Sequence, residues 1–155
     1  MICQRVPSHG VTSRDDGERA DLAAMLLPLT RALIDAEMPV LRANDVSMWG
    51  YTVLAYLATG PMRTQAALAR AAGADKTRII PVLDELQERG LIERRTDPDD
   101  RRVRLLAITG AGRRIKNAAQ EEIQRGEEQW LGELSAEERR MFLRALERLT
   151  RDAWG

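Results

Sequence analysis

The chain has 155 residues, a length suited to one compact domain, or to a small domain with long helical extensions. Hydrophobic residues make up 44% of it, charged residues 31% and aromatic residues only 4%, a composition that favours a mostly helical protein. No stretch approaches the roughly 18 apolar residues that a membrane span needs, and the first residues lack the apolar core of a secretory signal. We therefore expect a cytoplasmic protein without membrane contact.

The single cysteine and the single histidine limit the available chemistry. Cys3 has no second cysteine for an internal disulfide, and with His9 it makes no cluster for zinc. His9 lies in a polar stretch far from any plausible nucleophile and orienting acid, which argues against a catalytic triad. We predict no metal, no cofactor and no enzyme activity; the rival is a small enzyme that uses carboxylates such as Asp97, Asp99 and Asp100. Because the formal net charge is zero, binding to nucleic acid would need a local basic surface.

The first segments are a predicted tail and a helix. Residues 1–18 are polar, carry one proline and two glycines, and show no hydrophobic period, so we predict a mobile tail. From Arg19 onward apolar residues recur at helical spacing: Leu22, Met25, Leu26, Leu29 and Leu33. Pro28 inside this run and Pro39 near its end predict a kink or a break.

Three further helices follow, each with a capping residue. Ser47 is the predicted N-cap of a helix that ends at Gly60, and Thr64 that of a short helix that ends at Gly73. Asp75 then caps a helix that stops at Gly90 and carries Ile79, Val82, Leu83 and Leu86 on one face. The last two helices, with a turn between them, have the spacing of a helix-turn-helix.

A hairpin is predicted directly after the helix-turn-helix, in the position of a wing. Residues 91–95 and 103–108 favour two strands, and residues 96–102, with Pro98 and several aspartates, favour the loop between them. Thr109 caps a long helix that is expected to run to about Leu134, and Ser135 caps a last one.

The chain resembles the MarR (multiple antibiotic resistance regulator) family of bacterial winged-helix transcription factors. The family's wing signature is D-x-R, five residues, L-T, two residues and G, and here it reads Asp100, Arg102, Ile108, Thr109 and Gly112. The segments LAR at 68–70, GADKTR at 73–78 and LDELQERGLIERR at 83–95 are also similar to the family. The resemblance implies a mainly α fold: a winged helix-turn-helix at 44–109, flanked by dimerisation helices at 19–43 and 110–155.

The charged loop at 96–102 has two interpretations. It is either a solvated turn or a basic wing that follows the phosphates of DNA, and its place after a helix-turn-helix favours the wing. The arginines that would serve it are Arg94, Arg95, Arg101, Arg102 and Arg104. On an extended segment Asp100 and Arg102 point to the same side, so the carboxylate would hold the guanidinium. The resemblance likewise implies that Arg102 enters the minor groove and that Asp100 orients it.

The helix at 75–89 is predicted to meet the major groove. Its outward residues are Lys76, Thr77, Arg78, Ile80, Pro81 and Asp84, and Thr64 with Gln65 complete the surface for double-stranded DNA. The family commonly places Ser or Thr and a basic residue near positions 80 and 81, whereas Ile80 and Pro81 can only press against thymine methyl groups. Arg78 would read guanine or bind phosphate. Pro81 lacks an amide hydrogen for the carbonyl of Thr77 and predicts a bend.

The terminal helices have apolar faces that favour a homodimer over one intramolecular core. The residues concerned are Leu22, Met25, Leu26, Leu29, Ile115, Ile123, Trp130, Leu131, Phe142, Leu146 and Leu149. The resemblance implies that these helices form the dimer. A two-fold dimer reads a pseudo-palindrome with half-sites about 10 base pairs apart.

Many relatives bind a small aromatic or anionic effector between the dimer helices and the DNA-binding lobe. By position the candidates here are Met25, Arg42, Met48, Trp49, Tyr51, Tyr56 and Trp130, although such side chains also pack as ordinary core. We expect a repressor released by a small molecule. Two alternatives stay open: a winged-helix module for protein contact, and a redox sensor that uses Cys3.

Overall fold

The computed structural model describes residues 20–62 and 64–153, apart from the side chains of Lys76 and of residues 151–153. The predicted tail, with Cys3 and His9, lies outside the described residues. Six helices and two strands follow one another: α1 (Leu22–Ala43), α2 (Met48–Thr59), α3 (Gln65–Ala71), α4 (Lys76–Glu88), β1 (Ile92–Thr96), β2 (Arg104–Ile108), α5 (Gly110–Leu131) and α6 (Ala136–Ala153). In the described part of the chain the fold is therefore mainly helical, with a helix-turn-helix and a two-stranded wing.

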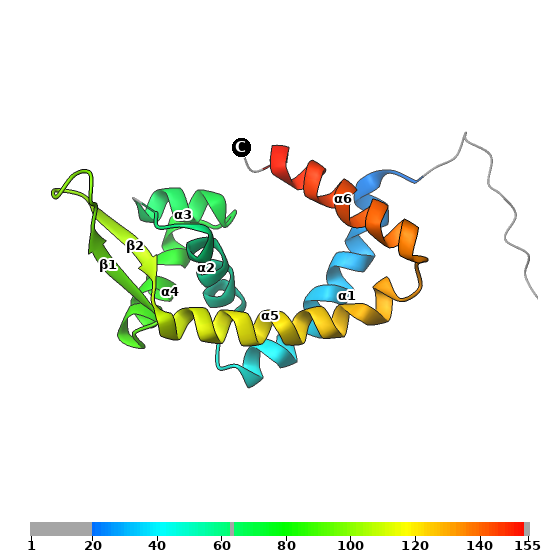
Figure 1. The fold of residues 1–155 in the computed structure, drawn as a ribbon, viewed down its shortest axis with the longest axis horizontal. Coiled ribbons are helices and arrows are strands. Elements are labelled where there is room, and N and C mark those ends of the chain that lie inside the picture. The colour runs from blue at the N-terminus through cyan, green and yellow to red at the C-terminus, as the bar shows by residue number, and fades with distance from the viewer. Residues whose placement is uncertain (1–19, 63, 154–155) are drawn as a thin grey trace, which may run out of the picture.

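The elements form two groups that α5 connects (Figure 1). One group holds α2, α3, α4 and the hairpin. The other holds α6 and the beginning of α1, and α5 runs along the molecule from the hairpin to α6. Within the described residues, no helix is long and apolar enough to cross a membrane.

Side-chain caps start the helices where the sequence predicts them. Each capping oxygen accepts an amide hydrogen from the first turn, at 2.7–3.1 Å: Ser47 from Gly50, Thr64 from Ala67, Asp75 from Thr77 and Thr109 from Gly112. At the start of α6, Ser135 and Glu138 exchange bonds, because the Glu138 carboxylate accepts the Ser135 amide at 2.9 Å while the Ser135 hydroxyl accepts that of Glu138 at 3.3 Å. These local bonds fix the boundaries between elements.

Two helix lengths differ from the expectation. α1 is one helix that contains both Pro28 and Pro39, so neither proline breaks it, and the alternative of a kink stays a prediction. Its N-cap is Asp21, whose carboxylate accepts the amide of Ala24 at 2.9 Å. α5 ends at Leu131 with Gly132 as its C-cap, about one turn before the predicted end.

The hairpin is antiparallel and is extended by one bridge to the segment before α3. Ile92 pairs with Ile108 at its base and Thr96 with Arg104 at its far end. Met62 and Leu106 exchange backbone hydrogen bonds of 2.9 and 2.8 Å, which ties the hairpin to the helix-turn-helix. Gly90 turns the chain from α4 into β1 with a φ of +65°, a conformation that favours glycine.

The core lies between the helix-turn-helix, the hairpin and the middle of α5. Its fully buried side chains come from several elements and include Leu41, Leu54, Leu57, Leu68, Ile79, Leu86 and Ile92. Ile123 of α5 belongs to this core, which corrects the expectation that it lies on a dimer face. The core therefore holds α3 and α4 rigidly against the hairpin.

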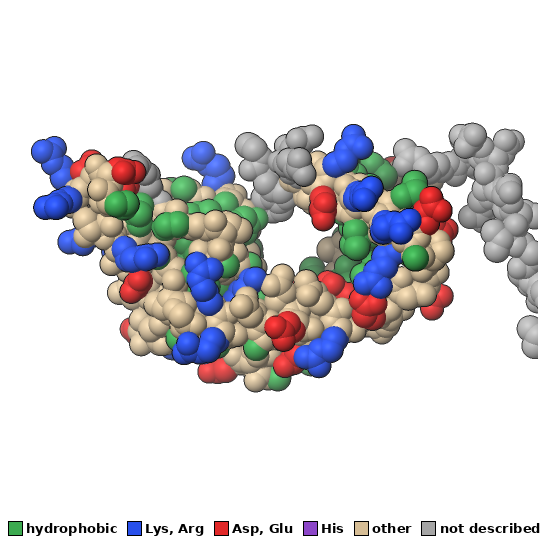
Figure 2. Space-filling view, viewed as in Figure 1, with side chains coloured by type: hydrophobic (Ala, Val, Ile, Leu, Met, Phe, Trp, Pro, Cys, Tyr) green, Lys and Arg blue, Asp and Glu red, His purple; other side chains and the backbone are tan. Residues whose placement is uncertain are grey.

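The first and last described helices carry large apolar side chains in contact with solvent. They include Leu22, Met25, Leu26, Leu27 and Ile34 on α1 and Met141, Leu143 and Leu149 on α6, and Leu149 is 66% exposed. Figure 2 shows such side chains among charged ones on the group of elements that contains α6. Because these side chains are not buried within the chain, the alternative of one intramolecular core does not account for them.

Candidate nucleic-acid interface

α4 buries one face in the core and presents the other to solvent. Ile79, Leu83 and Leu86 are buried, and Val82 is half-buried. The exposed side chains include those predicted for DNA, namely Thr77, Arg78, Ile80, Pro81 and Asp84; nothing is described for the Lys76 side chain. α4 continues as one helix through Pro81, which has no amide hydrogen to donate to the carbonyl of Thr77. The predicted bend at this position stays a prediction.

The hydroxyl of Thr77 already has a partner at the start of α4. It donates to the Asp75 carboxylate at 2.6 Å, and the Thr77 amide donates to the same oxygen at 2.7 Å. These two bonds lower the pKa of Asp75, and the positive charge of Arg78 adds to the effect. Thr77 is therefore left with its methyl group and its oxygen lone pairs to offer DNA.

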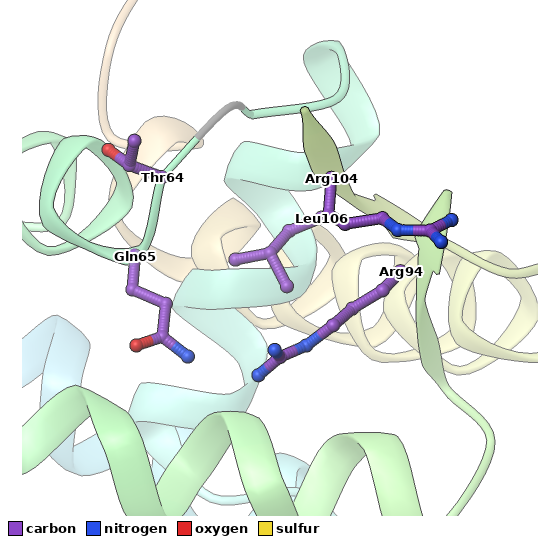
Figure 3. Close-up of a pocket in the computed structure, with 5 residues that line it drawn as sticks. All are labelled: Thr64, Gln65, Arg94, Arg104 and Leu106. Atoms are coloured by element: carbon purple, nitrogen blue, oxygen red, sulfur yellow. The ribbon is translucent and has the colours of Figure 1, made fainter. Parts of the chain in front are cut away.

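A cavity separates the start of α3 from the hairpin. It measures about 330 Å³ and is lined by Thr64, Gln65, Arg94, Arg104 and Leu106 (Figure 3). In Figure 3 the side chain of Arg94 extends from β1 toward that of Gln65, whereas Arg104 points the other way. Arg104 donates to the hydroxyl of Thr96 at 2.5 Å. The structure thus brings Arg94 and Gln65 to one cavity and holds Arg104 against the outer end of the hairpin.

Local hydrogen bonds shape the hairpin tip. The Asp97 side chain is only 2% exposed, and its Oδ1 accepts the amide of Asp99 at 2.9 Å. Asp100 accepts the amide of Arg102 at 3.0 Å through Oδ1, and its carbonyl accepts the amide of Val103 at 2.9 Å. These bonds are typical of Asx turns.

The predicted contact between Asp100 and Arg102 is wrong in one respect. Residues 101 and 102 form a turn and are not extended, so the two side chains need not point to one side. The carboxylate holds the backbone of Arg102, and no ion pair joins the two side chains in the described structure. Arg101 and Arg102 are both exposed at the tip. Asp100 therefore shapes the loop that carries Arg102. Among the described residues, the guanidinium of Arg102 forms no ion pair with a carboxylate.

Arg95 is separated from Arg94 by the alternation of side chains along β1. Successive residues of a strand point to opposite faces, so Arg94 lines the cavity beside α3 and Arg95 does not. The Arg95 guanidinium lies 3.4 Å from the Glu93 carboxylate, and both side chains are about half exposed. The five predicted arginines thus do not form one continuous surface.

One contact in this region was not anticipated from the sequence. The guanidinium carbon of Arg78 lies 5.6 Å from the centre of the Trp49 ring, within the range of a cation–π interaction. Trp49 belongs to α2 and is one of the residues that the sequence predicts for an effector pocket. No local motif links the two residues, so only the packing of α2 against α4 reveals the pair.

The predicted effector residues are dispersed. A cavity of about 200 Å³ between α1, α5 and α6 is lined mainly by leucines with Trp130 and Phe142, and a much smaller one lies beside Glu37 and Glu127. Of the seven candidates only Trp130 lines either cavity. Met48, Trp49, Tyr51 and Tyr56 pack against the core, whereas Met25 and Arg42 are exposed.

The surroundings of Tyr51 are acidic. Burial raises the pKa of Tyr51, and the charges of Glu37 and Glu127 raise it further. Burial also raises the pKa of Glu37, with the charge of Glu127 as the second cause. Two half-buried carboxyl groups therefore lie near the junction of α1, α2 and α5.

Known proteins with this arrangement are transcriptional regulators. The MarR family model matches residues 45–103. Transcriptional regulator HosA of Escherichia coli O111:H- is 32% identical over 105 residues, which are 68% of this chain and 78% of that protein. CouR of Rhodococcus jostii RHA1, solved with p-coumaroyl-CoA, has a TM-score of 0.69 and 25% identity over 83% of this chain and 91% of its own. The Mycobacterium tuberculosis MarR family protein Rv2887, at 24% identity over 84% of this chain and 99% of its own, supports the fold with a TM-score of 0.71.

Proposed function

Because the chain belongs to the MarR family of transcriptional regulators, we propose that it is a dimeric repressor that binds a pseudo-palindromic operator and is released by a small molecule. The observation that carries this proposal is the placement of two DNA-binding elements on one rigid group of helices. The exposed face of α4 suits the major groove, and the hairpin tip with Arg101 and Arg102 suits the adjacent backbone or minor groove. CouR, which has the same fold, has been solved on a 23-mer DNA duplex.

The local charge of the hairpin supports DNA binding despite the neutral chain. Arg101 and Arg102 are exposed and Arg94 reaches into an open cavity, so each is available to a phosphate. We also propose that the protein catalyses no reaction. The carboxylates of Asp97 and Asp100 accept backbone amides of the tip, which is a structural use of these groups. The site of action would be the cytoplasm, where bacterial DNA lies.

A second copy of the chain is the partner that the apolar ends would contact. The beginning of α1 and much of α6 expose leucines and methionines that one chain leaves in water, among them Leu22 at 57% and Met141 at 65%. A two-fold dimer would bury these side chains and present two copies of α4 about one turn of DNA apart.

Release by an effector is supported by relatives. CouR has been solved with p-coumaroyl-CoA, and PcaV of Streptomyces coelicolor, 28% identical to this chain, has been solved with its natural ligand. By this analogy we propose a small aromatic or anionic effector that binds between the dimer helices and the DNA-binding group. The acidic pair of Glu37 and Glu127 would repel an anion, so an anionic group would have to lie away from it.

The second candidate function is a protein-interaction module. It is favoured by Ile80 and Pro81, two apolar residues at the centre of the exposed α4 face. DNA binding should weaken steeply with salt, whereas an apolar protein contact should not. A redox function through Cys3 remains a hypothesis, since Cys3 lies outside the described residues.

Selection of genomic fragments by the purified protein tests the proposed function. The wild-type protein should enrich a pseudo-palindrome whose half-sites are about 10 base pairs apart, and should do so less well at higher salt. A matched variant, Arg102→Ala, should enrich it weakly or not at all. Failure of the wild-type protein to enrich any sequence would contradict operator binding and favour the protein-interaction module.

Sedimentation of the protein tests the dimer. Met141→Glu should shift the protein toward monomer, because it would bury a charge in the proposed interface. Arg140→Glu, at a neighbouring exposed position on α6, is the control and should stay dimeric. A wild-type protein that sediments as a monomer at micromolar concentration would remove the dimer from the proposal.

A further inference from the structure

Trp49 and Arg78 connect the surface of α2 to the exposed face of α4. The guanidinium carbon of Arg78 lies over the Trp49 ring, 5.6 Å from its centre. The ring is half-buried and packs against the hydrophobic core, while Arg78 is exposed. The positive charge of Arg78 on α4 thus lies over the aromatic ring of Trp49 on α2.

Trp49 lies in the first turn of α2, which a side-chain cap stabilises. Ser47 caps this helix by accepting the amide of Gly50 at 3.0 Å, so Trp49 lies within a capped first turn. A Cβ at Gly50 would lie 3.0 Å from Val46 and 3.7 Å from Leu86 of α4. The 3.7 Å distance to Leu86 is ordinary van der Waals spacing, so α2 packs against α4 beside the ring that lies under Arg78.

The guanidinium over the ring keeps its hydrogen-bond donors. An aromatic face attracts the flat side of a guanidinium and leaves its N–H groups, which lie in the plane, free to bind an acceptor. Within the described residues no acceptor takes a hydrogen bond from the Arg78 side chain, and Arg78 is the one cation on α4 whose side chain is described. Since the hydroxyl hydrogen of Thr77 is used by Asp75, Arg78 is the main donor among the described side chains of the first turn of α4.

We propose that Trp49 positions Arg78 for DNA binding, by holding the guanidinium over the indole ring so that its N–H edge meets a guanine or a phosphate of the operator. The inference rests on the proposed function. It makes Trp49 a positioning residue that lies outside the recognition helix. The advantage is entropic, because a long side chain that is already ordered loses fewer conformations when it binds.

The contact itself is tested in the free protein by the NMR signal of the Trp49 indole N–H, which Trp49→Phe identifies by its loss. Arg78→Met, which removes the charge and keeps the length, should shift this signal and leave the other indole signals in place. Arg78→Lys should produce an intermediate change. An indole signal that is identical in the wild type and in Arg78→Met would overturn the inference, whether or not the protein binds DNA.

The positioning role is tested by operator affinities of four proteins: wild type, Trp49→Leu, Arg78→Ala and the double variant. Trp49→Leu should weaken binding by about two- to fivefold, as expected for loss of an exposed cation–π contact. In the Arg78→Ala background the same change should have almost no effect. Trp49→Phe should restore most of the affinity. Thr52→Val, a change on the same helix that removes only a hydroxyl bonded to the Met48 carbonyl, should leave operator affinity unchanged in the folded protein.

The outcomes separate this inference from the function on which it rests. If Trp49→Leu weakens binding equally with and without Arg78, Trp49 acts by packing or by its own contact with DNA, and the positioning role is wrong. If Trp49→Leu has no effect on an operator that the wild type binds, the inference fails alone. If the wild type binds no operator, the proposed function fails, and the positioning role fails with it.

Discussion

Arg89 at the end of α4 reaches the turn between α1 and α2 and binds Asp45 there. Its Nη2 donates to the backbone carbonyl of Asp45 at 2.6 Å and lies 3.1 Å from the carboxylate, while Nη1 lies 3.0 Å from Glu85. Asp45 has a φ of +51° and is the one non-glycine residue of the described chain in this region. The contact joins the helix proposed to read DNA to the end of a proposed dimer helix.

We predict that Arg89→Met lowers the free energy of unfolding by about 1 kcal/mol, because the bond to the carbonyl is charge-assisted but partly exposed. Asp45→Asn should be nearly neutral, since the carbonyl remains and asparagine tolerates a positive φ. Asp45→Val should cost about 1–2 kcal/mol through backbone strain. Urea denaturation of the three variants measures these differences. Equal stability of Arg89→Met and the wild type would show that the contact contributes nothing.

Two substitutions at Asp100 distinguish a carboxylate that shapes the loop from a carboxylate that binds the guanidinium of Arg102. Asp100→Asn retains an oxygen that accepts the amide of Arg102, whereas Asp100→Ala does not. Both variants remove the same negative charge, so any difference between them reports the turn. We expect Asp100→Asn to bind operator about two- to tenfold more tightly than Asp100→Ala, because this ratio corresponds to the net free energy of one hydrogen bond. Equal affinities, measured by fluorescence anisotropy, would contradict this function of the carboxylate.

Gly112 lies where α5 begins against the end of the hairpin. A Cβ at this position would lie 2.2 Å from the backbone oxygen of Leu91, so Gly112→Ala must displace α5 or the strand. We expect a loss of about 3 kcal/mol of unfolding free energy. Gly126→Ala on the same helix is the control, because its Cβ would meet no atom within 4 Å. It should stabilise the protein by about 0.5–1 kcal/mol, and thermal unfolding of both variants shows whether the sign differs.

The acidic pair predicts how stability depends on pH. Burial raises the pKa of Glu37 above the value of 4.5 that it has when unfolded, and Glu127 raises it further. The stabilisation from this group is complete below pH 4.5 and is lost as the pH rises through the higher pKa of the folded state.

Glu37→Gln should therefore raise the unfolding free energy at pH 7 and give no such gain at pH 4. Denaturation of the variant at both pH values measures this. Glu121→Gln, an exposed position on α5, is the control and should show no difference between them. A Glu37→Gln variant that is less stable at pH 7 than the wild type would mean that the carboxylate has a favourable partner.

Features that depend on local hydrogen bonds follow from the sequence. Ser47, Thr64, Asp75 and Thr109 cap their helices as predicted, because a cap needs only a side-chain oxygen and the next amide groups. The position of the hairpin after α4 also follows from the alternation of apolar residues and from the turn residues between the strands.

Features that depend on packing in three dimensions do not follow from the sequence alone. Trp49 and Arg78 meet because α2 packs against α4, and no spacing rule contains that information. The interpretation of Asp100 was wrong because an aspartate side chain competes for nearby amides and makes its own turn. α1 continues through Pro28 and Pro39, so the break that local rules allow there does not occur, and local preference alone is a poor guide to helix length.

Titration of the selected operator duplex with the wild-type protein and with Arg102→Ala, between about 50 and 200 mM salt, tests operator binding through the wing most directly. The wild-type affinity should fall steeply as salt increases. Arg102→Ala should bind at least about tenfold more weakly, with a smaller salt dependence and an unchanged sedimentation mass. Equal affinities of the two proteins, or a wild-type affinity that does not change with salt, would contradict binding of DNA by the arginines of the hairpin.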